Sequence, residues 1–236
     1  MDDIENSNEM FPEGPECQAD SGTLFSPFEP GAEVQRTRRN LPHWQQAGVA
    51  YFVTFRLADS VPAVKLHLWM EERKAWTQKN PEPWSAPQWQ EYNRLFPARM
   101  EKWLDAGEGQ CTLAMDEISL IVEGALLHFD GLRYVMDEYA IMPNHVHVLV
   151  SPKPSYDLSQ VLHGWKSYTA HEINKLLGRS GSVWQDENFD HIVRSVEQLE
   201  LFRKYIRENP EKGRVAAGKF RVGRGMGLLL DEEAED

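Results

Sequence analysis

The sequence predicts an α+β fold: a ferredoxin-like (RRM-like) antiparallel sheet sandwich, with a helical insertion after its first strand and an added C-terminal helix. Two observations predict it. Apolar, β-branched runs alternate with segments of helical spacing in the order strand, helices, strand, strand, helix, strand, helix. A Pro-Asn turn signal also joins the two consecutive strand patterns, as expected for a hairpin. With 236 residues, 41% of them hydrophobic, the chain is long enough to bury a core.

Three parts of the chain differ in composition. Residues 1–34 are rich in acidic residues, Ser, Pro and Gly, which predicts a disordered acidic leader. Residues 35–224 carry the strand and helix patterns of one domain, and residues 225–236 end in an acidic tail. We expect residues 58–130 to form the helical insertion of that domain.

The first strand pattern is the run VAYFVTFRL at residues 49–57, whose aromatic and β-branched residues suit a central, buried strand. Trp and Leu at helical spacing then predict helices over residues 64–77 and 86–104, separated by prolines. A third amphipathic helix is predicted over residues 116–129.

The second half of the chain repeats the alternation of strands and helices. A hairpin of strands 134–141 and 145–150 is followed by a long helix over residues 158–177, closed by Gly178. A short strand is predicted over residues 189–194, and a last helix from about 196 to 208, which we expect Asn209-Pro210 to stop.

The charge of the chain is unevenly distributed. The net charge is −12, which by itself disfavours a nucleic-acid partner. Residues 201–224, however, hold eight basic and two acidic residues, and this asymmetry is compatible with a polyanionic partner at the C-terminal part. We expect a cytoplasmic protein without a membrane partner, because no long apolar run or signal peptide is visible. Cys17 and Cys111 do not form a disulfide or metal pattern.

Two pairs of residues carry candidate chemistry. His145 and His147 are two apart on a predicted strand, so their imidazoles share a face and are candidates for binding a metal ion. The pair alone leaves open that both histidines only pack in the core. Tyr205 and Asn209 are four apart on the last predicted helix, so a phenol and an amide oxygen also share a face.

Four ordered sequence blocks resemble the REP-associated tyrosine transposases, relatives of the single-tyrosine HUH transposases. The resemblance spans roughly residues 41–215, including an initial Leu-Pro-His-Trp and Tyr-Phe-Val-Thr-Phe-Arg-Leu. The blocks are Met-Pro-Asn-His-Val-His-Val-Leu at 142–149, Trp-Lys-Ser-Tyr at 165–168, Trp-Gln at 184–185 with Asp-His-Ile-Val-Arg at 190–194, and Tyr-Ile-Arg-Glu-Asn-Pro at 205–210.

The resemblance implies an enzyme that cuts and rejoins single-stranded DNA beside palindromic hairpins such as REP elements, through a covalent 5′-phosphotyrosine. It implies Tyr205 as the catalytic nucleophile. His145, His147 and Asn209 would be ligands of a divalent metal, Mg²⁺ or Mn²⁺. Tyr168 competes with Tyr205 for the nucleophile's role, and we favour Tyr205 because Asn209 accompanies it.

DNA contacts are predicted for basic residues near this site, which would bind phosphates without reading sequence. Whether the protein is a monomer or a homodimer stays open. The candidate contacts are Arg36, Arg38, Arg39, Lys166, Arg194, Arg203, Lys204, Arg207, Lys212 and Arg214.

Two other classes of function remain. A non-catalytic nucleic-acid-binding module, or an inactive relic, is an alternative because ferredoxin-like sheets also form RNA-recognition domains. A His-x-His metal hydrolase is the weaker alternative, because further acidic or histidine ligands are not evident.

Overall fold

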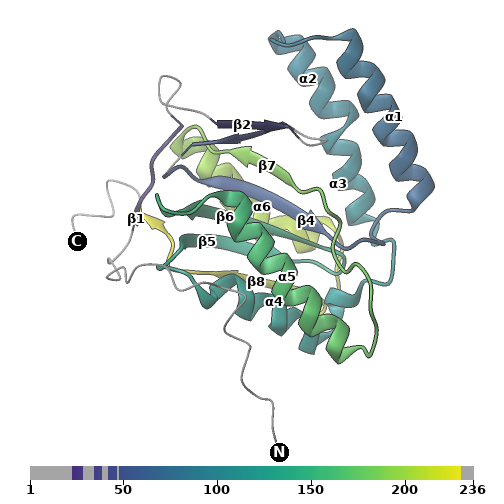
Figure 1. The fold of residues 1–236 in the computed structure, drawn as a ribbon, viewed down its shortest axis with the longest axis vertical. Helices are drawn as coiled ribbons and strands as arrows, with labels where there is room; N and C mark the ends of the chain where they lie inside the picture. The colour runs from purple at the N-terminus through teal and green to yellow at the C-terminus, as the bar shows by residue number, and fades with distance from the viewer. Residues whose placement is uncertain (1–22, 29–34, 39–41, 47, 230–236) are drawn as a thin grey trace, which may run out of the picture.

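The computed structural model describes residues 23–28, 35–38, 42–46 and 48–229. A five-stranded antiparallel sheet forms its centre, in the order β7-β4-β6-β5-β8 (Figure 1). Its strands are β4 (Tyr51–Arg56), β5 (Tyr134–Ile141), β6 (His145–Pro152), β7 (Phe189–Ile192) and β8 (Arg221–Arg224).

Four strands of this sheet, β4 to β7, and two helices have the predicted β-α-β-β-α-β order. α4 (Asp116–His128) connects β4 to β5, and α5 (Leu158–Leu176) connects β6 to β7. The ferredoxin-like α+β prediction is therefore confirmed. The sequence did not predict β8, which extends the sheet by pairing with β5.

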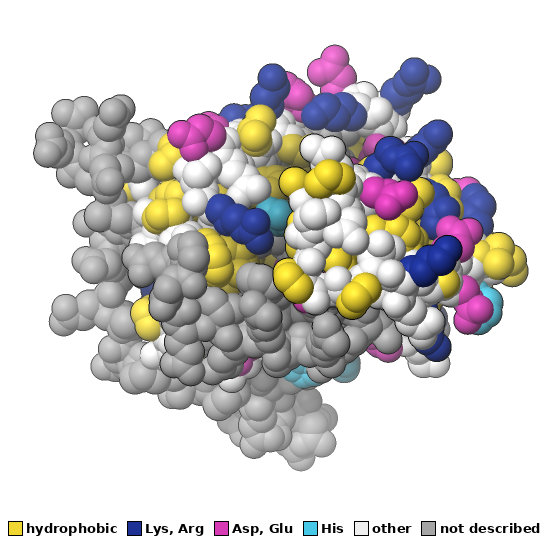
Figure 2. Space-filling model, turned by 90° about the horizontal axis from the view of Figure 1, so that it is seen from above, with side chains coloured by type: hydrophobic (Ala, Val, Ile, Leu, Met, Phe, Trp, Pro, Cys, Tyr) yellow, Lys and Arg dark blue, Asp and Glu magenta, His cyan; other side chains and the backbone are white. Residues whose placement is uncertain are grey.

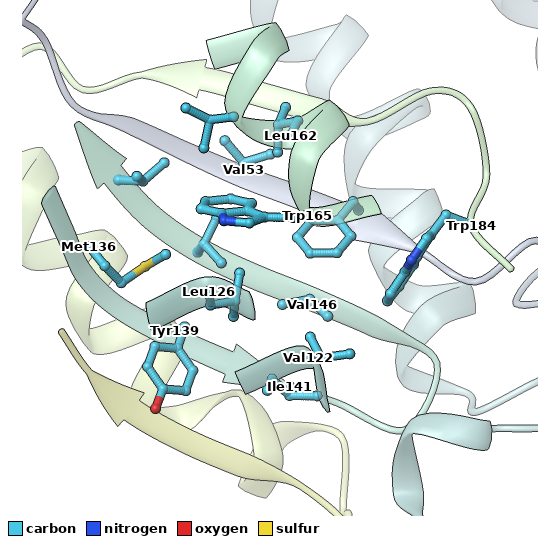
Figure 3. Packing of buried hydrophobic residues seen from close by; sticks show 14 of the residues in the cluster. Val53, Val122, Leu126, Met136, Tyr139, Ile141, Val146, Leu162, Trp165 and Trp184 are labelled. Atoms are coloured by element: carbon cyan, nitrogen blue, oxygen red, sulfur yellow. The ribbon is translucent and has the colours of Figure 1, made fainter. Parts of the chain in front are cut away.

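One face of the sheet carries the larger core, under α4 and α5 (Figure 1). Alternate residues of β4, namely Tyr51, Val53 and Phe55, lie on this face. Figure 3 shows Trp165 of α5 packed over the sheet close to Leu126 of α4, with Trp184 farther to the right in the same cluster. Because this face is closed by helices, it is a structural core.

The opposite face of the sheet is covered by α6 (Val196–Lys212). A β-bulge in β5 inserts one residue between Met136 and Tyr139, so that both side chains join the larger core. Asp137, within the bulge, instead forms a buried bidentate ion pair with Arg203 of α6, at 2.6 and 2.8 Å. This ion pair fixes α6 to the sheet.

The insertion is shorter than predicted. Because α4 packs against α5 and belongs to the sandwich, only α1 (Ala63–Lys79), α2 (Ala86–Leu95) and α3 (Pro97–Asp105) are added to the fold, followed by a 3₁₀ turn, η1 (Thr112–Ala114). The single helix predicted over residues 86–104 is divided at Phe96-Pro97, since proline lacks the N–H that continues a helix. In Figure 1, α1 and α2 project beyond the sheet.

The last helix is longer than predicted. Asn209-Pro210 was expected to end it, but α6 continues through Pro210 to Lys212. Pro210 lies in the final turn of the helix and lacks the N–H that would bond to the Ile206 carbonyl.

Parts of the predicted leader and tail, residues 23–28 and 225–229, belong to the described structure. Within the leader, β1 (Thr23–Leu24) pairs with β9 (Leu228–Leu229) of the predicted tail, and Leu228 is buried. Residues 1–22, 29–34 and 230–236 lie outside the described residues. A separate two-stranded sheet joins β2 (Gln35–Arg38) and β3 (Pro42–Gln45). No helix among the described residues is long and apolar enough to span a membrane.

Candidate functional site

Two imidazoles meet on the α6 face of the sheet. β6 begins at His145, and its alternation directs His145 and His147 toward α6, while Val146 and Val148 enter the larger core. The two Nε2 atoms lie 3.0 Å apart. The structure therefore brings the predicted pair together.

The neighbouring residues fix how these rings are oriented. The Asn144 Nδ2 donates to the carbonyls of Leu104 and Glu108, so its Oδ1 is left to accept from His145 Nδ1, 2.7 Å away. A neutral His145 then carries its lone pair on Nε2. Thr54 Oγ1 lies 2.8 Å from Nδ1 of His147 and holds the second ring. Such partners are typical of metal-binding histidines.

Burial keeps both rings neutral. It lowers the pKa of His145 to about 3, and together with the neighbouring His145 it lowers the pKa of His147 well below its ordinary value. Neutral imidazole is the form that binds a metal.

The spacing of the two nitrogens also fits a metal. Two ligand atoms about 2.1 Å from one ion and at right angles to each other lie about 3.0 Å apart. This is the separation of the two Nε2 atoms. No cluster of three or more His, Cys, Asp or Glu is present within the described part of the chain, so further ligands would have to be other groups.

Tyr205 of α6 lies directly against the histidine pair. Its ring centroid is 5.2 Å from that of His147 and 5.6 Å from that of Phe52, in edge-to-face contacts. Its hydroxyl donates to Glu101 Oε1 at 3.1 Å. Burial, and then the charges of Glu101 and Asp105, raise the pKa of the Tyr205 phenol well above its ordinary value, while a hydrogen bond with the Asn209 side chain lowers it.

Asn209 lies one helical turn after Tyr205 and is only 1% exposed. Its Oδ1 is buried without a hydrogen-bond partner among the described residues. An unsatisfied buried acceptor is costly, and a carbonyl oxygen suits Mg²⁺ or Mn²⁺. The residues present therefore fit a divalent cation held by His145, His147 and Asn209.

The helical insertion supplies carboxylates to the site. Glu101 and Asp105 lie one turn apart on α3, and both have a raised pKa, mainly through burial. The positive charge of Lys212 on α6 acts in the opposite direction and lowers the pKa of both carboxyls. The Lys212 ammonium lies 5.1 Å from the centre of the Tyr205 ring. A proton acceptor thus lies at hydrogen-bond distance from the phenol.

A cleft of about 620 Å³ lies between the insertion and the sheet. One wall comes from α1 and α3, including Glu101, and the other from Thr54 and Arg56 of β4 and from residues 185–189. Thr54, which contacts His147, and Glu101, which contacts Tyr205, line this cleft, whereas the buried histidines themselves do not. Arg56 is directly opposite His145 in the pairing of β4 with β6.

The competing tyrosine lies elsewhere. Tyr168 is on α5, which covers the other face of the sheet, and its side chain is 40% exposed in a groove with α4. It is therefore separated from the histidine pair by the sheet, which supports the choice of Tyr205.

The predicted DNA contacts fall into several groups. Arg203 is corrected to a structural residue, because its guanidinium is buried against Asp137 and also binds the Leu228 carbonyl. Lys166 donates to the carbonyls of Gln185 and Asp186 and so holds the loop before β7. The structure describes no side chain for Arg36 or Arg38, and Arg39 lies outside the described residues.

The remaining basic candidates are exposed. Lys204 and Lys212 pair with Glu208, and Arg207 pairs with Glu138. Arg194 and Arg214 are also at the surface. On the face drawn in Figure 2, Lys and Arg side chains lie interspersed with Asp and Glu, without one continuous basic patch.

Sequence reasoning missed several residues of this site. Asn144 was interpreted only as part of a turn, and Thr54 only as part of a buried strand, although both adjoin the histidines. Alternation along β4 places Thr54 and Arg56 on one face, and this was the available signal. Nothing in the spacing of Glu101, more than 100 residues before Tyr205, indicated their contact.

Comparison with known proteins bears out the resemblance in part of the chain. Residues 129–209 match the family model described as "Transposase IS200 like", which covers about a third of the chain, from just before β5 to Asn209. The match includes both histidines and Tyr205 but neither Arg56 nor Glu101. No curated protein matches.

A solved structure is also similar to this chain: a REP-associated tyrosine transposase bound to a REP hairpin. It shares 13% sequence identity, with a TM-score of 0.37, and the alignment covers 75% of this chain and 73% of that chain.

Proposed function

We propose that the protein is a metal-dependent single-stranded DNA endonuclease and strand transferase, a transposase that acts at palindromic hairpins such as REP elements. The contact of the Tyr205 ring with the His147 ring is the observation that carries this proposal. It brings a phenol nucleophile from α6 to two neutral imidazoles of β6, within the region that matches IS200-like transposases.

His145, His147 and Asn209 would hold a divalent cation, Mg²⁺ or Mn²⁺. When bound, the cation would polarise a non-bridging oxygen of the scissile phosphate and hold this phosphate in line. Asn144 and Thr54 orient the two imidazoles for this role.

Tyr205 would attack the scissile phosphorus. Its hydroxyl oxygen forms a bond to phosphorus, the bond from phosphorus to the 3′ oxygen breaks, and the products are a 5′-phosphotyrosine and a free 3′-OH. Glu101 would accept the phenol proton through its existing hydrogen bond and return it to the departing 3′ oxygen. Attack by a 3′-OH on the phosphotyrosine reverses the step and rejoins DNA without ATP.

The exposed basic residues on and after α6 remain proposed phosphate contacts: Lys204, Arg207, Lys212 and Arg214, together with Arg194 and the arm of Arg36, Arg38 and Arg39. The cytoplasmic location stays a prediction, and the choice between monomer and homodimer stays open.

Trapping of a covalent adduct tests the proposal. The protein is incubated with a labelled single-stranded oligonucleotide that contains a hairpin, with Mg²⁺ or Mn²⁺, and resolved on a denaturing gel. We expect a protein-DNA adduct that is abolished in Tyr205→Phe and retained in Tyr168→Phe, the matched control on the other face of the sheet. An adduct that survives Tyr205→Phe contradicts the assignment.

The same gel distinguishes the alternative functions. Cleaved DNA without an adduct would indicate a hydrolase that uses metal-activated water. Binding of the hairpin without cleavage in either metal would indicate a non-catalytic nucleic-acid-binding module or an inactive relic.

A further inference from the structure

Arg56 is a buried cation without an anionic partner. The residue is 8% exposed, and its only side-chain hydrogen bond with a described residue runs from Nη1 to the Ser60 hydroxyl, 3.1 Å away. No carboxylate lies within ion-pair distance of its guanidinium in the described ranges. Burial lowers the pKa of Arg56 to about 10, so the group stays charged at neutral pH.

This arrangement is unfavourable for the protein alone. Taking an arginine charge out of water without a counter-charge is energetically costly, and buried arginines are normally paired. Arg203 illustrates the normal case, since Asp137 accepts two hydrogen bonds from it. The difference between the two buried arginines indicates that Arg56 receives its counter-charge from a ligand.

The position of Arg56 identifies the ligand's chemistry. Arg56 lines the cleft between the insertion and the sheet, and it is paired across β4 and β6 with His145. Side chains at directly opposed positions have Cβ atoms about 5 Å apart. Four carboxylates line the cleft as well, namely Glu71, Glu101, Asp186 and Glu187. Arg73 and Lys74 lie on the α1 wall, and Arg56 is the cationic side chain that lines the sheet wall, beside Thr54.

We infer that Arg56 binds a phosphodiester group of the single-stranded DNA, at the linkage that lies beside the histidine pair. The planar guanidinium offers paired donors that match two phosphate oxygens. This inference rests on the proposed function, and it assigns to β4 a phosphate-binding residue that lies outside the family match.

Neutralising single phosphates tests the inference without catalysis. Each linkage of the single-stranded flank of a hairpin oligonucleotide is replaced in turn by an uncharged methylphosphonate, and binding is measured in EDTA. Tyr205→Phe is the parent, so that no covalent adduct forms. We expect one linkage at which neutralisation weakens binding on the order of 10-fold, as for a charge-assisted hydrogen bond. In Arg56→Gln/Tyr205→Phe, neutralising that same linkage should weaken binding less than about twofold, while the effects of neutralising other linkages persist.

Arg73→Gln is the matched control. Arg73 lines the opposite wall of the same cleft and donates to the Tyr92 hydroxyl. In this control, neutralising the Arg56-dependent linkage should weaken binding as much as it does in the parent. If neutralising each linkage weakens binding of Arg56→Gln as much as it weakens binding of the parent, the inference is overturned.

Thermal unfolding separates a binding role from a structural one. Because the unpaired charge is costly, Arg56→Met is expected to unfold at the same or a higher temperature than the wild type in the absence of DNA. If neither Arg56→Gln nor Arg56→Met folds, Arg56 is required by the fold itself and the inference is overturned.

The outcomes also separate this inference from the proposed function. If binding depends on Arg56 at one linkage but the wild type forms no covalent adduct with metal, the phosphate site is supported and the proposed transposase function is contradicted. If the wild type forms an adduct but no linkage depends on Arg56, the proposed transposase function is supported and the phosphate site is contradicted. Failure to bind any hairpin oligonucleotide would overturn both.

Discussion

At the scale of single residues, the attack proposed for Tyr205 would depend on Glu101. Burial and nearby negative charge raise the pKa of the phenol, so it is protonated at neutral pH. A protonated phenol is a weak nucleophile, and it needs an acceptor for its proton. Glu101 Oε1 lies 3.1 Å from the hydroxyl and would be that acceptor in the proposed reaction.

Glu101→Gln is therefore expected to slow adduct formation by about 100-fold, as for loss of a general base. Burial raises the pKa of Glu101, Asp105 acts in the same direction, and Tyr205 and Lys212 oppose it. The base must be ionised, so the wild-type rate falls as the pH decreases through this raised pKa. In Glu101→Gln, single-turnover rates measured across a range of pH should not show this decrease at low pH.

The stability of the same variant is a control. A carboxyl whose pKa is raised in the folded state destabilises that state once the pH is above its folded pKa. Glu101→Gln should thus be at least as stable as the wild type at pH 7, as measured by urea unfolding. A large loss of stability would mean that the lower rate reflects misfolding.

At the scale of elements, α6 carries the proposed nucleophile and is fixed in register on the sheet. The buried pair of Arg203 and Asp137 links α6 to the bulge of β5, and Asp137 also accepts from the Leu228 amide. Ile206 and Leu199 of α6 bury their side chains on the same face. This docking determines that Tyr205 meets His147.

Arg203→Leu should destabilise the protein by about 3–5 kcal/mol, because it leaves Asp137 buried without its partner. Lys204→Leu, at the exposed neighbouring position, should change the free energy of unfolding by less than about 0.5 kcal/mol. Chemical denaturation measures both. Equal effects of the two substitutions would contradict the anchoring role of Arg203.

At the scale of the whole molecule, the site is assembled from three regions far apart in sequence. β6 contributes the histidines, α6 contributes Tyr205 and Asn209, and the insertion contributes Glu101. Asn144 connects two of these regions, since its side chain holds both His145 and the carbonyls of Leu104 and Glu108. A metal bound at the centre should therefore stabilise the entire fold.

Mn²⁺ is expected to raise the unfolding temperature, by an amount that corresponds to about 2.7 kcal/mol at 100 times its Kd. EDTA should reverse the shift, and the double variant His145→Ala/His147→Ala should show none. Asn209→Ala should retain a shift but require more Mn²⁺, because it loses one oxygen ligand. Differential scanning fluorimetry across a Mn²⁺ titration measures these shifts, and an equal shift in the double variant would contradict the site.

Local sequence patterns were enough to predict the β-α-β-β-α-β order, the shared face of His145 and His147, and the shared face of Tyr205 and Asn209. These follow from local periodicity, since side chains two apart on a strand, or four apart on a helix, share a face in any fold. Three-dimensional packing was needed to show that α4 belongs to the sandwich, that Arg203 is an anchor and that Glu101 contacts Tyr205. It also decided that Arg56 is buried without a counter-charge. Such contacts join residues from distant elements, and burial and pairing of charge depend on packing that no local pattern encodes.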